Sequence, residues 1–293
     1  MTLEQLRIFV FVAERGHMTR AAEALGLTQS AVSAAVSTLE ARYQVRLFDR
    51  VGRGLALTEA GRVFLIEASA VLLRAKAAEQ ALVDLAGLKR GYLTLAASQT
   101  LSSYWLPARA ARFAQAHPGI SLSLIAGNTA EAAQAVIDGR ADLGFVEGAV
   151  DDAVLLRRPV GGDRIALYAA PGHPLAGQPV GAADLAGLRW VLRESGSGTR
   201  SHVEQALAAR GLAPADLLDV VLELRSNEAA LSAAEADRGL VAAVSELAAQ
   251  ALVKVGRVIR LDHDLGARTF DLLAHKERRL SAAAQAFVDE LAA

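Results

Sequence analysis

Residues 18–43 read MTRAAEALGLTQSAVSAAVSTLEARY and predict two helices joined by a tight turn. Ala22, Gly26 and Val32 follow one another at spacings of four and six residues. A small residue fits where two helices touch, a glycine fits the turn, and a branched apolar residue fixes the second helix. This spacing is typical of a helix-turn-helix, which places its second helix in the major groove of DNA.

The second of these helices is predicted to have one buried face and one polar face. Its apolar residues recur at helical spacing; they are Val32, Val36, Leu39 and Tyr43. The opposite face carries short polar groups that can approach base edges: Gln29, Ser30, Ser33 and Ser37. An ordinary helical hairpin inside an enzyme could show the same spacing, so the segments that follow decide between the two interpretations.

A basic β-hairpin is predicted directly after the second helix. Two short apolar runs, Leu47–Phe48 and Leu55–Leu57, flank the turn Gly52-Arg53-Gly54. Arg46 and Arg50 lie in the same stretch, so we expect a wing against phosphates or the minor groove. Arginine-rich hairpins can also be plain solvated surface, but this one follows a candidate recognition helix.

Composition limits the classes of protein to consider. The 293 residues are 53% hydrophobic and 22% charged, which favours two or three folded domains over disorder. Cysteine is absent, which excludes disulfides and thiolate chemistry. No apolar run is long enough to span a membrane and no export signal is evident at the amino terminus, so we expect a cytoplasmic protein without membrane association. The net charge is −1, but residues 1–62 carry 8 arginines against 6 acidic residues.

The rest of the chain predicts a linker helix and an α/β body. Residues 61–87 form the predicted linker, whose apolar repeat suits pairing with a second copy of the chain; a core helix of the following domain is the alternative. A glycine-bounded hinge is expected at 87–91. Strands and helices then alternate over 91–293, with two strands predicted at 258–262 and 268–275 near the end. We expect lobe I to comprise about 91–161 and 267–293, and lobe II about 162–266.

Over its whole length the sequence resembles LysR-type transcriptional regulators. The resemblance is carried by LTQSAVSAAVSTLE (27–40), RLFDR (46–50), LTEAG (57–61), GNTAEAAQAVIDGRADLGFVEG (127–148) and HPLA (173–176). It implies a winged helix-turn-helix at 1–60, a dimerising linker, and an α/β effector domain of two lobes that resembles a periplasmic binding protein. It also implies dimers or tetramers on inverted-repeat operators in double-stranded DNA, with RNA polymerase as a further candidate partner.

One departure from the family concerns base readout. Many members carry a long basic or amide side chain where this chain has Ala34 and Ala35, and alanine cannot make a bidentate contact with guanine. Base discrimination is therefore assigned to the polar face listed above, to Arg53 and to DNA shape. We expect Gln29 to contact a base edge, and Thr28 and Arg50 to contact phosphate; Thr28 could equally serve only as a helix cap.

Two strand-to-helix segments predict an anion site between the lobes. Helix amino termini offer free N–H groups, and glycines let the backbone approach a ligand closely. The predicted effector residues are Ser98, Gln99, Thr100, Ser195, Gly196, Ser197, Gly198, Thr199 and Arg200. Each segment could also be an ordinary cap and turn. No cofactor and no metal are expected, and GSGTR lacks the lysine of a nucleotide-binding loop.

Two further residues are candidates for the same cleft. Glu147 would oppose an anion unless it took a proton or paired with Arg193 or Arg200; alternatively it would contact an ammonium group. Asn227 is either a helix cap or a ligand contact. Segments SQT (98–100) and RESGSGTR (193–200) resemble regulators of sulfur assimilation and carbon fixation, which implies a sulfur oxyanion or a phosphorylated or carboxylated metabolite.

Two other functions compete with a regulator. An enzyme is disfavoured because the sequence has no G-x-S-x-G, H-E-x-x-H or cysteine nucleophile. His263 between Asp262 and Asp264 fits a solvated loop better than a metal site. A solute-binding protein would fit the body alone but would leave the first 60 residues unexplained.

Overall fold

The structure is a computed structural model that describes residues 1–52, 54–85, 91–212 and 219–292. The chain divides into two compact units, Met1–Leu85 and Ala86–Ala293. The predicted hinge at 87–91 lies outside the described residues except for Gly91.

The first unit is a helical head with a β-hairpin and a long helix. Its elements are α1 (Leu3–Arg15), α2 (Met18–Leu25), α3 (Gln29–Tyr43), β1 (Phe48–Val51), β2 (Gly54–Leu57) and α4 (Glu59–Leu85). Phe9, Val12 and Val32 are fully buried in its core. The antiparallel β1–β2 pair confirms the predicted hairpin. These elements form the predicted winged helix-turn-helix.

The stripe predicted for α3 is correct for three of its four residues. Val32, Val36 and Leu39 are buried, but Tyr43 is 52% exposed. Its inclusion in the buried face was wrong because the helix ends there: Gln44 takes a left-handed conformation with φ of 53°. The last turn therefore extends past the core that holds the earlier residues.

Helix α4 continues well beyond the core of the head. Ala68 is buried against the head, whereas Val63, Ile66 and Leu82 are 57%, 71% and 70% exposed. Exposed apolar side chains along a long helix favour pairing with another helix, because pairing removes them from water.

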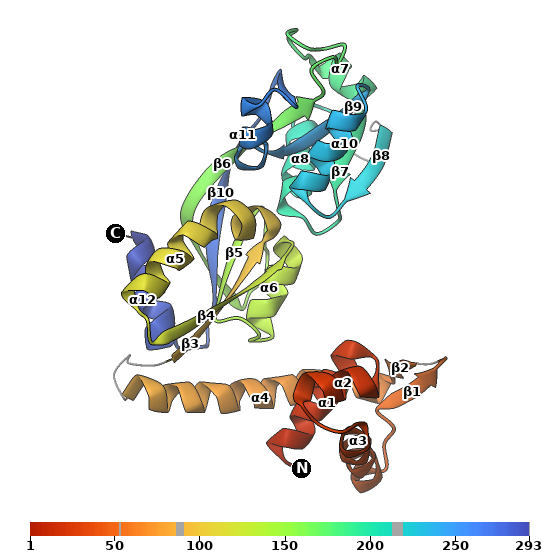
Figure 1. The fold of residues 1–293 in the computed structure, drawn as a ribbon, viewed down its shortest axis with the longest axis vertical. Helices are drawn as coiled ribbons and strands as arrows, with labels where there is room; N and C mark the ends of the chain where they lie inside the picture. The colour runs from red at the N-terminus through yellow and green to blue at the C-terminus, as the bar shows by residue number, and fades with distance from the viewer. Residues whose placement is uncertain (53, 86–90, 213–218, 293) are drawn as a thin grey trace. The chain divides into compact units, whose positions relative to one another are not determined.

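The second unit is built on one eight-stranded sheet of order β4-β3-β5-β10-β6-β9-β7-β8. Its first-lobe elements are β3 (Gly91–Ser98), η1 (Leu101–Trp105), α5 (Leu106–Ala116), β4 (Ile120–Gly127), α6 (Thr129–Ile137), β5 (Leu143–Glu147) and α12 (Ala282–Ala292). The second lobe contains α7 (Ala182–Gly187), β7 (Arg189–Arg193), α8 (Gly198–Ala208), β8 (Asp219–Leu224), α10 (Asn227–Ala236), β9 (Leu240–Ser245) and α11 (Glu246–Lys254). Two long strands, β6 (Leu155–Ala169) and β10 (Ile259–His275), run through both lobes (Figure 1).

Each lobe buries apolar residues on both faces of the sheet, as a mostly parallel sheet requires. In the first lobe, Leu95 and Phe145 pack toward α5 and α12, while Ala96 and Val146 pack toward α6. In the second lobe, α7 and α8 cover one face and α10 and α11 cover the other. The predicted α/β fold with two lobes is confirmed.

Two details differ from the sequence prediction. The strands predicted at 258–262 and 268–275 are one strand, β10, which keeps pairing with β6 through register shifts around Asp264. The helix that follows β3 begins with a π-helical turn, η1, which no sequence pattern predicted; in it the Leu106 N–H reaches the Leu101 carbonyl. Such irregular turns depend on tertiary contacts rather than on a local sequence pattern.

Candidate functional site

Helix α3 presents the predicted polar face to solvent. Gly26 ends α2 with φ of 65°, and the Thr28 hydroxyl begins α3 by accepting the Ala31 N–H at 3.2 Å. Because the other face of α3 is buried, the predicted polar groups face solvent: Gln29, Ser30 and Ser37 are exposed, and Ser33 is half-buried. The helix thus offers short hydrogen-bonding groups on a rigid support.

The other predicted DNA contacts are divided between a cap and the wing. Thr28 is a helix cap, but it is exposed and its hydroxyl lies 3.1 Å from Ser30 Oγ, so capping and phosphate contact are compatible. Arg50 is exposed on β1. Arg53 lies outside the described residues.

In the second unit, strand ends and helix starts from both lobes converge on one buried polar cluster. Ser98 ends β3 and Thr100 follows it, Glu147 ends β5, Thr199 lies in the first turn of α8 and Asn227 begins α10. Each of these five side chains is at most 1% exposed. The structure therefore brings together predicted residues from both lobes.

Arg268 lies at the centre of this cluster, and the sequence analysis missed it. From β10, its guanidinium contacts Asp163 at 2.6 Å, Thr199 Oγ1 at 3.0 Å and Glu147 at 3.2 Å. A fourth contact reaches Thr100 Oγ1 at 3.5 Å. The signal that could have identified it is the opposite charge of Asp163 and Arg268 at the ends of two buried apolar runs, which the antiparallel register places opposite each other.

Arg268 is the shared cation of two carboxylates in this cluster, Glu147 and Asp163. Burial disfavours the charged form of Arg268, but Glu147 and Asp163 together raise the pKa of Arg268 above its ordinary value. Glu147 also accepts a hydrogen bond from the Ser98 hydroxyl. The pairing of Glu147 with Arg193 or Arg200 that the sequence suggested is wrong, because its partner is Arg268.

A second buried arginine lies beside this cluster. Arg193, at the end of β7, pairs with Glu194 at 2.9 Å and donates to Asn227 Oδ1 at 3.2 Å and Gln99 Oε1 at 3.3 Å. The Gln99 oxygen also accepts the Asn227 N–H at 3.2 Å. An amide oxygen of the first lobe therefore occupies the amino terminus of α10.

The structure separates Arg200 from the other predicted effector residues. Its guanidinium is held by Glu204 at 2.8 Å and Glu223 at 2.5 Å, carboxylates of α8 and β8. Those contacts raise the pKa of Arg200 against the opposing effect of burial. An anion in the buried cluster would have to compete with both carboxylates for this side chain.

The segment 195–198 instead meets the first lobe through its backbone. Ser195 and Gly196 are exposed, Ser197 is buried, and the Gly196 carbonyl accepts the Ala130 N–H at 3.2 Å. A Cβ at Gly198 would lie 1.9 Å from the Glu147 carbonyl oxygen. Only glycine allows this approach of the two lobes.

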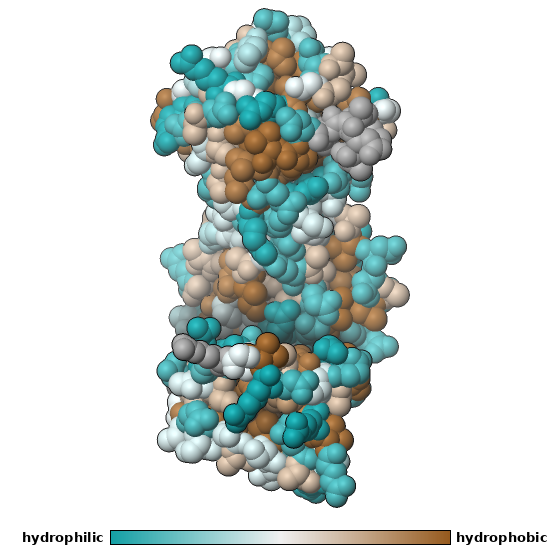
Figure 2. Space-filling view, turned by 90° about the vertical axis from the view of Figure 1, so that its right-hand side faces the viewer, coloured by the Kyte–Doolittle hydropathy of each residue, from teal (hydrophilic) through white to brown (hydrophobic). Residues whose placement is uncertain are grey.

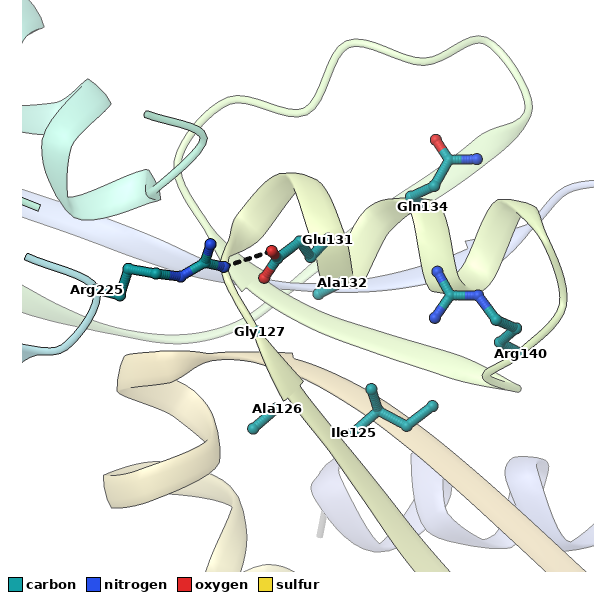
Figure 3. Close-up of a pocket in the computed structure, with 8 residues that line it drawn as sticks. All are labelled: Ile125, Ala126, Gly127, Glu131, Ala132, Gln134, Arg140 and Arg225. Carbon is teal, nitrogen blue, oxygen red and sulfur yellow. Dashed lines mark hydrogen bonds and ion pairs between the residues drawn. The ribbon is translucent and has the colours of Figure 1, made fainter. Parts of the chain in front are cut away.

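A surface pocket of about 460 Å³ lies between β4, α6 and Arg225 of the second lobe (Figure 3). Arg225 reaches Glu131 of α6 at 2.5 Å. The Asn128 N–H lowers the pKa of Glu131 most, burial opposes this effect, and Arg225 lowers the pKa further. Both of these charged groups are thus engaged with each other.

A winged helix-turn-helix joined to a two-lobed α/β unit with a buried polar cluster between its lobes defines a class, the DNA-binding transcriptional regulators with an effector-binding domain. The chain belongs to the LysR family of that class. Residues 3–62 match the family described as "Bacterial regulatory helix-turn-helix protein, lysR family", and residues 86–293 match "LysR substrate binding domain".

Named relatives agree with this placement and with the predicted branch. The chain is 36% identical to the Escherichia coli K12 regulator YeiE, with 99% of this chain and 96% of that protein covered. It is 33% identical to the RuBisCO operon transcriptional regulator of Allochromatium vinosum (98% and 94% covered) and 30% identical to CysL of Bacillus subtilis (79% and 78% covered). These relatives are named as transcriptional regulators, which places the chain with regulators and not with enzymes.

Solved structures share the fold. Full-length CbnR in complex with its target DNA superposes with a TM-score of 0.71 at 21% identity, covering 100% of this chain and 99% of that chain. The regulatory domain of Synechocystis PCC6803 CcmR, in complex with 2-PG, superposes with a TM-score of 0.61 at 27% identity, covering 69% and 96%. Among the described residues, no helix is long and apolar enough to cross a membrane.

Proposed function

We propose that this regulator binds a small anionic effector in the buried cluster around Arg268 and thereby changes its binding to an inverted-repeat operator. The observation that carries the proposal is the convergence of Thr100, Thr199 and Asn227, each at a helix start, on a cleft with a central guanidinium. Hydroxyl donors, helix amino termini and an arginine are the groups that bind carboxylates, phosphates and sulfur oxyanions.

The relatives narrow the chemistry of the effector. CcmR holds 2-PG in its regulatory domain, and the matched relatives include RuBisCO operon regulators and CysL. We therefore propose a phosphorylated or carboxylated metabolite, or a sulfur oxyanion. The ammonium contact considered for Glu147 is disfavoured because that carboxylate is already paired with Arg268.

For DNA, the proposal assigns base contacts to α3 and phosphate contacts to Thr28 and the wing. Gln29, Ser30, Ser33 and Ser37 would face the major groove, while Arg50 would contact phosphate. Alanines at 34 and 35 leave room for thymine methyl groups on the same face. The regulator would act in the cytoplasm, with RNA polymerase as a candidate partner.

Exposed apolar surface supports self-association. It lies on α4, as described above, and on the edge strands β4 and β8, which leave Ile125, Val220 and Leu222 between 36% and 38% exposed. Figure 2 shows apolar patches interspersed with polar surface on one face of the molecule. Unpaired edge strands with apolar side chains favour contact with another chain, and a dimer would match the two halves of an inverted repeat.

The test measures anion binding and operator binding on the full chain. Sulfate, inorganic phosphate, 2-PG and small dicarboxylates are titrated by calorimetry, and an operator is selected from random duplex DNA. Thr100→Val should lower anion affinity about tenfold or more while leaving DNA affinity unchanged, because a buried donor is lost. Thr94→Val, within the strand that precedes Thr100, should change neither. Full anion affinity in Thr100→Val would contradict the site.

A further inference from the structure

We propose that Tyr104 and Glu228 form an interlobe clasp that holds the cleft closed when it is empty, and that the clasp sets the effector concentration needed for a response. Tyr104 belongs to η1 of the first lobe, and Glu228 is the second residue of α10 in the second lobe. The Tyr104 hydroxyl donates to Glu228 Oε1. The concentration effect rests on the proposed function, whereas the closure does not.

Glu228 receives two donors from the first lobe. Besides Tyr104, Gln99 Nε2 donates to the two oxygens of Glu228 at 2.8 and 3.1 Å. Because the amide nitrogen is held there, the Gln99 oxygen is turned toward Arg193 and the Asn227 N–H. The carboxylate thus orients an amide that joins both lobes at the start of α10.

The ring of Tyr104 strengthens the same connection. Although it belongs to the first lobe, it packs against the core of the second lobe that contains Leu231 and Val244. The π-helical turn contributes to this placement, since its wider turn changes the direction of the side chains it carries. Burial, and then Glu228, raise the pKa of Tyr104 above its ordinary value, so its hydroxyl remains a donor near neutral pH.

The clasp lies outside the groups that would hold the effector. Thr100 and Thr199 are fully buried and each contacts the buried Arg268, whereas Glu228 is exposed. The clasp can therefore persist whether the cleft is empty or filled. It would then bias the lobes toward closure without selecting among effectors, because only differential contacts with the anion can produce selectivity.

Closure is measured by spin-label distances between the lobes in the full chain without added anion. The sequence has no cysteine, so Gln115→Cys and Ala208→Cys, both exposed, provide one label in each lobe. Labelled chains are diluted with unlabelled protein to remove distances between copies. We expect Tyr104→Phe and Glu228→Ala each to broaden the distance distribution toward longer values, and the double variant to add little to either. Tyr168→Phe makes the same chemical change away from the lobe boundary and should match the wild type.

Effector titration gives the second readout. If closure is lost, the Kd for an anion should rise about two- to tenfold, because a smaller fraction of the protein is in the closed state that binds it. The factor should be the same for every anion that binds. If the rise in Kd differed from one anion to another, Tyr104 and Glu228 would be contacting the anion directly, and the clasp proposal would be wrong. Wild-type distances in both variants would also overturn it. If distances change but no anion binds the wild type, the clasp stands and the proposed effector fails.

Discussion

Helix α3 and the interlobe cleft use the same residue types in opposite ways. On α3, Gln29 and Ser37 are exposed, and the opposite, apolar face of the helix is buried in the core of the head. In the cleft, Thr100 and Thr199 are fully buried and bonded to Arg268. The proposed DNA-contacting residues of the head are therefore separate from the residues that stabilise it, whereas the proposed effector site also contributes to folding.

This difference determines what a mutation can change. Removing an exposed polar group on α3 should alter DNA recognition with little effect on folding. Removing a buried partner in the cleft leaves another polar or charged group unsatisfied, which costs folding free energy as well as binding. Four variants test the contrast.

The largest effect is expected for Arg268→Met. It leaves Asp163 and Glu147 buried without their cation, so the free energy of unfolding should fall by about 3–5 kcal/mol. Denaturant unfolding of the full chain measures this. The control is Arg260→Met, on the same strand as Arg268. It breaks a half-exposed pair with Glu246 of α11 and should cost less than about 1 kcal/mol. Equal losses would remove the distinction between the cleft and the surface.

Gly198→Ala tests the close approach of the lobes. Its Cβ would collide with the Glu147 carbonyl oxygen, so the lobes should be held apart and anion affinity lost, with a stability loss of about 1–3 kcal/mol. Calorimetric titration and operator binding are measured together, and operator affinity should persist. Gly187→Ala, where a Cβ meets open space, is the control. Normal anion binding in Gly198→Ala would show that closure does not require this contact.

Gln29→Ala tests the head. The ratio of operator affinity to random-DNA affinity should fall about tenfold, as for loss of one base contact worth about 1–3 kcal/mol, while the free energy of unfolding stays within about 0.5 kcal/mol. Competition binding at fixed salt gives the ratio. Gln115→Ala, an exposed glutamine on α5, should leave both quantities unchanged. An unchanged ratio for Gln29→Ala would remove this residue from base readout.

The smallest effect concerns pH. Burial lowers the pKa of His202, whose Nε2 contacts the Leu265 carbonyl at 3.0 Å. The unfolded chain therefore takes up a proton at this site more readily, and stability contributed by His202 should be complete above its ordinary pKa of 6.5 and decline as pH falls below it. His202→Asn should flatten that decline between pH 7 and 5, as measured by denaturant unfolding across this range. An identical pH profile in the variant would contradict the assignment.

The sequence predicted the head more fully than the cleft. Thr28, Gly26 and the Val32–Leu39 stripe are local signals, because capping, turn and periodicity operate within a few residues. The prediction that Tyr43 is buried was wrong because the sequence did not show where the helix ends. The strand-to-helix segments of the cleft were equally local, and the structure brings Ser98, Thr100 and Thr199 together as expected.

Arg268 and Asp163 could not be predicted in the same way. They are more than 100 residues apart, and their pairing depends on a strand register that bulges shift. The wrong prediction of an arginine partner for Glu147 has the same cause, because the tertiary fold decides which of several arginines lies beside it. Long-range register, rather than residue type, is what the sequence analysis lacked.

The continuity of β6 and β10 limits how the second unit can signal. Because these strands pair with each other from Leu155 to Ala169 and from Ile259 to His275, the lobes share a two-stranded ribbon that can bend or twist but prevents one lobe from sliding away from the other along the strands. A ribbon resists stretching but yields to torsion, most readily where its ladder is interrupted near Asp264 and Phe270. Effector binding would then be transmitted to the rest of the chain as a rotation of one lobe relative to the other about the β6–β10 ribbon.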